Sequence, residues 1–79
     1  GRLVGLAEIA RARGNFAGAQ ARYNEVLATQ PSYFPAKLGL ADATWDSGDH
    51  AGARIQYAEI ASSYPSHMVP ARVTERTKK

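Results

Sequence analysis

The chain has 79 residues, no cysteine and a formal net charge of +3 at pH 7. This length allows one small domain, and the lack of cysteine excludes a disulfide framework and a thiolate metal site. The excess charge lies at the C-terminal end, in Arg72, Arg76, Lys78 and Lys79 beside Glu75, while residues 1–71 are neutral. A nucleic-acid interface should carry a basic stripe along one face, so nucleic acid is not the expected partner.

The first two predicted helices form an antiparallel pair. Apolar residues recur at helical spacing through residues 2–13, and Gly14 supplies the backbone freedom that ends a helix. Asn15 is a good N-cap for a second helix, which continues to Gln30 and stops before Pro31. Because only about two residues join them, the two helices must lie antiparallel.

Residues 35–65 repeat the same order of signals. A helix with Leu40, Ala41 and Trp45 leads to a turn at Gly48, and a partner helix follows it. Residues 1–31 laid over residues 35–65 give ten identities at a spacing of 34 residues, which marks stacked repeats. No useful stretch alternates with period two, so strands are not expected and the predicted fold class is all-α.

A third helix of the first type is expected to begin near Pro70. Residues 66–73 echo residues 32–38 with one inserted residue, but polar residues follow Val73 where further stacking would need small apolar ones. A polar final helix is one way in which a solenoid ends, and a frayed remnant is the alternative. Two copies and a partial third also lead us to expect that the chain is an excerpt of a longer protein.

These features resemble the tetratricopeptide repeat, a family of 34-residue helix-turn-helix units. The resemblance rests on Leu6 and Leu40, Ala7 and Ala41, Gly14-Asn15 and Gly48-Asp49, Ala19 and Ala53, Tyr23 and Tyr57, Val26 and Ile60, and Pro31 and Pro65. It implies an α-solenoid of antiparallel helix pairs wound into a right-handed superhelix. Repeat one would cover about residues 1–33, repeat two about residues 34–67, and a capping helix about residues 68–79.

The resemblance also implies a non-catalytic scaffold that binds a peptide or protein segment on a concave face lined by the first helix of each unit. Helical steps place seven residues on that face: Val4, Glu8, Arg11, Leu38, Asp42, Trp45 and Asp46. Trp45 is the expected anchor, with packing against the third helix as the alternative. Glu8 and Asp42 recur one repeat apart and favour a basic or mixed-charge peptide, unless they are ordinary solvated helix charges.

The alternative function is a structural spacer or a self-association module, because the exposed end faces of a short array can stack on copies of themselves. A membrane segment is not expected, since no apolar run approaches the roughly 18 residues that a bilayer requires. Catalysis is not expected either, because the most concentrated polar set, residues 46–50, resembles a helix turn. His50 and His67 have no partner at ligand spacing, so no metal or cofactor is predicted.

Overall fold

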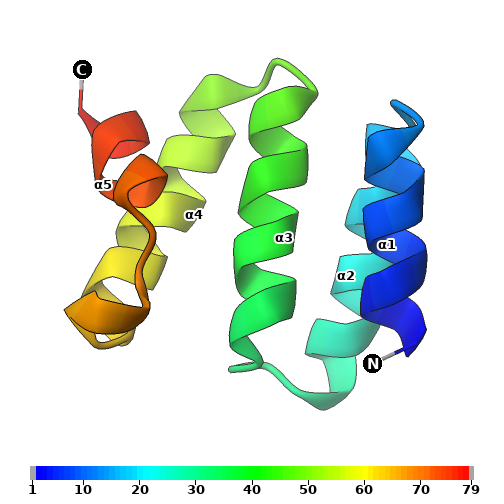
Figure 1. Cartoon of the computed structure of the whole chain (residues 1–79), viewed down its shortest axis with the longest axis horizontal. Coiled ribbons are helices and arrows are strands. Elements are labelled where there is room, and N and C mark those ends of the chain that lie inside the picture. Colours follow the sequence, from blue (N-terminus) through cyan, green and yellow to red (C-terminus); the bar gives the residue numbers. More distant parts are fainter. Residues whose placement is uncertain (1, 79) are drawn as a thin grey trace.

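The computed structural model describes residues 2–78 as a succession of helices (Figure 1). The α-helices are α1 (Arg2–Ala12), α2 (Phe16–Thr29), α3 (Phe34–Asp46), α4 (His50–Ser63) and α5 (Ala71–Thr77), with a 3₁₀ turn at Ser66–Met68. Since no strand occurs within residues 2–78, the predicted all-α class is confirmed. None of the helices in this described part has the length and apolar character needed to cross a membrane.

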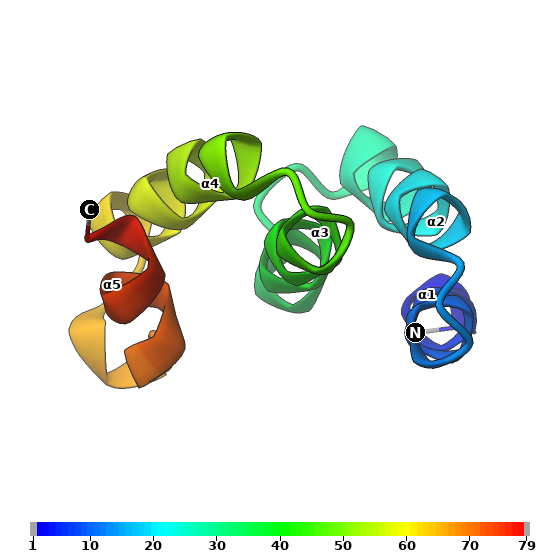
Figure 2. The same cartoon turned by 90° about the horizontal axis from the view of Figure 1, so that it is seen from above.

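The helices lie in two layers (Figure 2). One layer holds α2 and α4, and the other holds α1, α3 and α5, which are the first helices of successive units. Within the second layer α3 is set back between α1 and α5, so this side of the molecule is the concave one. The order of the repeats therefore places every first-type helix on a single face.

Both helix pairs close through the same kind of turn. Gly14 and Gly48 have φ values of 79° and 98°, in the left-handed region that favours glycine. Asn15 and Asp49 follow them as N-caps, and each side chain accepts a hydrogen bond from the backbone N–H three residues later, at 3.0 and 2.9 Å. The predicted turn chemistry is thus confirmed in both repeats.

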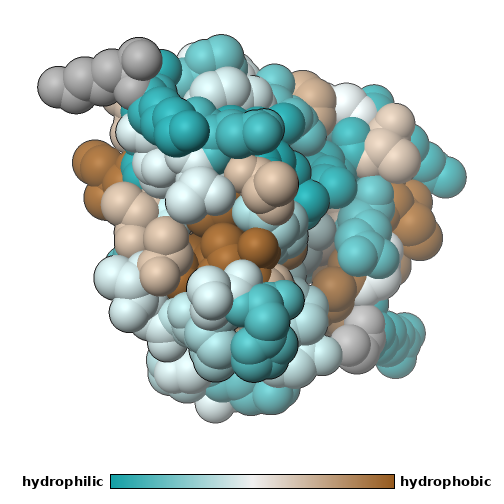
Figure 3. All heavy atoms as spheres, turned by 60° about the vertical axis from the view of Figure 1, so that its left-hand side comes forward, coloured by the Kyte–Doolittle hydropathy of each residue, from teal (hydrophilic) through white to brown (hydrophobic). Residues whose placement is uncertain are grey.

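Small side chains and tyrosines build the core between the layers. Ala7, Ala19, Ala41 and Ala53 are fully buried where the helices of each pair approach closely. One apolar cluster joins α1, α2 and α3, and a second joins α3, α4 and α5 through Val73. Seen from the side of α4 and α5, the surface is mainly hydrophilic, with small apolar areas between the polar residues (Figure 3). The last helix thus covers the second repeat as a capping helix would.

The final helix is shorter than the expected range of residues 68–79. It begins at Ala71, after Pro70 at the N-cap position with an extended backbone (φ −61°, ψ 151°), and it ends at Thr77. Proline restricts the residue before it to extended conformations, so a helix cannot continue smoothly from the 3₁₀ turn through Val69. Lys79 lies outside the described residues.

Candidate functional site

A cleft of about 240 Å³ lies between α1, α3 and α5 on the concave side. Larger hollows lie against α1 and α2, but this cleft is lined by all three first-type helices. It combines apolar residues of α3 with charged side chains of its neighbours, and its lining is Glu8, Arg11, Tyr23, Phe34, Pro35, Leu38, Gly39, Asp42 and Arg72. Four of the seven predicted concave residues, Glu8, Arg11, Leu38 and Asp42, are therefore brought together.

Asp42 is buried in the cleft wall and gathers three arginines. Its exposed fraction is 5%. Arg72 of α5 binds it in a bidentate manner, with Nε donating to Oδ1 at 3.1 Å and Nη2 donating to Oδ2 at 2.7 Å. Nη1 of Arg76 lies 3.5 Å from Oδ1, and Nη1 of Arg11 lies 3.6 Å from Oδ2. One carboxylate thus links α1, α3 and α5, and Asp42 positions arginines instead of facing solvent as the sequence led us to expect.

The hydroxyl of Tyr57 completes this network from α4. It donates to Oδ1 of Asp42 at 2.5 Å and accepts from Nη1 of Arg76 at 2.8 Å. Burial raises the pKa of Tyr57 to about 12; the hydrogen bond to Asp42 acts in the same direction, and the hydrogen bond from Arg76 opposes it. Tyr57 therefore remains a neutral donor far above neutral pH.

We expect the unfolding free energy to fall between pH 10 and pH 12 more steeply in the parent chain than in a Tyr57→Phe variant. An unfolded tyrosine ionises near its ordinary pKa of 10.0, whereas folded Tyr57 keeps its proton to about 12. A raised pKa makes a contribution that is complete below pH 10 and is lost as the pH rises to 12, about 2–3 kcal/mol in all. Urea unfolding followed by circular dichroism across this range measures both slopes. The other titrating groups are common to the two proteins, so equal slopes would contradict the prediction.

Val4 is corrected from a groove residue to a core residue. It is buried at 9% exposure in the cluster that joins α1, α2 and α3. Val4 precedes the fully buried Ala7 by three positions, so the two side chains lie on the same face of α1 and pack against α2. Asp46, by contrast, stays near the cleft, because its Oδ2 lies 3.8 Å from Nε of Arg11.

Trp45 is packed at the far end of α3. His50 stacks on its ring with centroids 3.8 Å apart and planes inclined by 9°, and the guanidinium carbon of Arg76 lies 4.8 Å from the ring centroid. The ring also packs against the cluster that contains Val73. This environment matches the packing alternative, and it leaves Trp45 only partly exposed.

The arginines of α5 are the functional residues that the concave-face prediction missed. Arg72 and Arg76 are four residues apart, so they lie on one face of α5, and both reach Asp42. The available signal was this spacing together with a carboxylate on the preceding first-type helix. The inserted residue before α5 hid the register that brings them together.

The geometry can be set beside known proteins. A family model described as tetratricopeptide repeat matches residues 4–67, which include all of α2, α3 and α4. No curated protein and no solved structure was found to match the chain. Tetratricopeptide repeats generally mediate protein–protein interactions and are generally non-catalytic. With two capped helix pairs in 34-residue register and a family match over most of its length, this chain belongs to the tetratricopeptide repeat family.

Proposed function

We propose that the chain is a non-catalytic scaffold that binds an extended segment of a partner protein in the concave cleft. The carrying observation is that the cleft joins α1, α3 and α5 and presents apolar and charged groups side by side. Phe34 and Leu38 offer apolar surface, while Arg11, Arg72 and Glu8 offer charge. A cleft of this size suits individual side chains of a peptide, not a folded domain.

The charges of the cleft favour a mixed-charge segment over a purely basic one. The carboxylate of Asp42 is compensated by guanidinium groups, so it offers little attraction to a basic peptide. Arg11 approaches its carboxylates only at 3.6 and 3.8 Å, longer than a hydrogen bond, and its side chain is one third exposed. An acidic side chain of the ligand would therefore meet Arg11 and Arg72, and a basic one would meet the exposed Glu8.

The test is a selection of peptides from a random displayed library on the whole chain, followed by affinity measurements with variants. Leu38→Ala and Arg11→Gln should each weaken the selected peptides about tenfold, because they remove apolar contact and a charge-assisted hydrogen bond. Ile55→Ala is the matched control, since Ile55 is 72% exposed on α4 and does not line the cleft. Equal affinities for the cleft variants and the control would refute binding in the cleft.

A further inference from the structure

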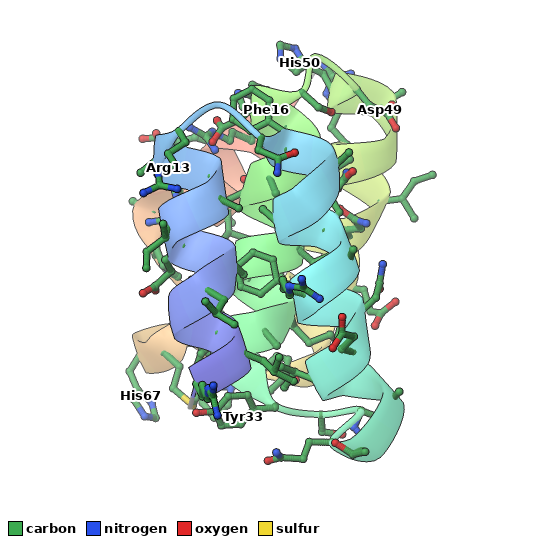
Figure 4. All side chains as sticks on the ribbon, turned by 90° about the vertical axis from the view of Figure 1, so that its right-hand side faces the viewer. Arg13, Phe16, Tyr33, Asp49, His50 and His67 are labelled. Atoms are coloured by element: carbon green, nitrogen blue, oxygen red, sulfur yellow. The ribbon has the colours of Figure 1, made fainter. Side chains whose placement is uncertain are left out.

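The outer face of α1 repeats a surface that α2 covers one repeat later. On α3, Ala43 belongs to the cluster shared with α2, and Leu40 packs against that cluster. The equivalent residues of α1 are Ile9 and Leu6, which are 52% and 43% exposed. We call this side the α1 end face and define it by Gly5, Leu6, Ile9, Ala10, Ala21 and Arg22. Figure 4 views the molecule from this side, with α1 and α2 in front of α3.

The α1 end face is hollowed as well as apolar. A hollow of about 340 Å³ lies between α1 and α2, and Leu6, Ile9 and Ala10 line it from α1. Arg22 and Ala21 line it from α2. Large exposed apolar residues gathered around a hollow are typical of an interaction surface, whereas single ones are ordinary.

Two equivalent glycines show what the α1 end face lacks. A methyl group on Gly39 would lie 2.2 Å from Cζ of Tyr23, so the tyrosine ring of α2 rests directly on the backbone of α3. The same position on Gly5 has no atom within 4 Å. Gly5 lies inside α1 without a positive φ, where glycine costs about 1 kcal/mol relative to alanine. The seat for a tyrosine ring is therefore filled at Gly39 and open at Gly5.

The helix that fills the equivalent seat also defines the chemistry of the missing occupant. Tyr23 of α2 lies on Gly39, and Leu27, four residues later, lines a hollow together with Leu40. Positions four apart lie on one face of a helix. From this we infer that the α1 end face is a docking site for a helix with tyrosine and leucine four residues apart, its tyrosine on Gly5 and its leucine on Leu6. This partner binds outside the concave cleft.

A second copy of the chain does not fit this description. Its own Tyr23 and Tyr57 are 1% and 0% exposed, so neither can be presented without opening the core. The residue four positions after Tyr57 is Ala61, not leucine. The occupant is therefore a helix of the α2 type on another repeat unit or protein, not a copy of the folded chain.

The decisive experiment joins residues 1–34 in front of the full chain, so that an added α2 precedes the original α1 at the natural spacing of 34 residues. Gly5→Ala in the original part should then lower the melting temperature by roughly 4–8 °C, because the methyl group meets the added tyrosine ring. The same substitution in the 79-residue chain should leave the melting temperature unchanged or raise it. The matched control is Gly5→Ala in the added part, whose seat stays open and which should cause no decrease.

A second measurement covers the case in which the extended protein does not fold. A peptide of residues 14–33 added to the methyl-labelled chain should shift the signals of Leu6 and Ile9, and the same peptide with Tyr23→Ala should not. The proposal is overturned if Gly5→Ala acts equally in both parts of the extended protein, or if both peptides act alike. A dimer of the 79-residue chain that Ile9→Glu abolishes would also overturn it, because a second copy would then occupy the face.

Discussion

Replacing Asp42 with asparagine should lower the free energy of unfolding by about 2–4 kcal/mol. Removing one member of a buried ion pair costs about 3–5 kcal/mol, and the partial exposure of Arg11, Arg72 and Arg76 allows some recovery through hydration. A domain of this size has a total stability of only about 4–12 kcal/mol. Urea unfolding followed by circular dichroism measures the change, which should be accompanied by loss of order in α5.

Asp46→Asn is the matched control for this experiment. It removes the same charge from the same helix, but Asp46 is more exposed and lies 3.8 Å from a single arginine, Arg11. Exposed ion pairs contribute about 0–1 kcal/mol, so this variant should unfold nearly as the parent does. Equal losses for Asp42→Asn and Asp46→Asn would show that net charge, and not the buried network, sets the stability.

Gly39→Ala should destabilise the chain by about 1–2 kcal/mol. The added methyl group would lie 2.2 Å from the ring of Tyr23, whose buried position leaves it little room to move. Overpacking of this kind costs about 1–3 kcal/mol, and the better helix propensity of alanine returns up to about 1 kcal/mol. Thermal and urea unfolding should both report the loss.

The equivalent Gly5→Ala provides the comparison, and the two changes should have opposite signs. Gly5 occupies the same place in the first repeat, but the space beside it is open. The substitution there gains helix propensity without a clash, so stability should rise by up to about 1 kcal/mol. A gain at both glycines would mean that Tyr23 adapts freely, and the account of inter-repeat packing given above would fail.

The parts of this fold that local chemistry determines could be predicted from the sequence. Gly14 and Gly48 end helices, Asn15 and Asp49 begin them, and none of these roles depends on distant residues. Because the spacing of 34 residues repeats these signals, it also predicted the pairing of the helices. The family match and the observed helices confirm this part.

The side-chain arrangement of the cleft could not be predicted in the same way. A projection onto helical faces places Asp42 on the concave side, but it cannot tell a solvated carboxylate from one covered by arginines of a later helix. The inserted residue before α5 turns every side chain of that helix by about 100°, since α-helices have 3.6 residues per turn. Val4 was misplaced for a related reason: the boundary between core and concave face passes within one turn of α1.

The single carboxylate shared by α1, α3 and α5 has a mechanical consequence. Helical repeat stacks bend by small rotations between neighbouring units, and here the two outer helices of the concave layer are tied to one atom group on the central helix. Opening the cleft must stretch contacts to Asp42 from both sides, so the curvature of the array depends on ionic strength as well as on apolar packing. Raising the salt concentration should therefore make this short array more pliable before it unfolds.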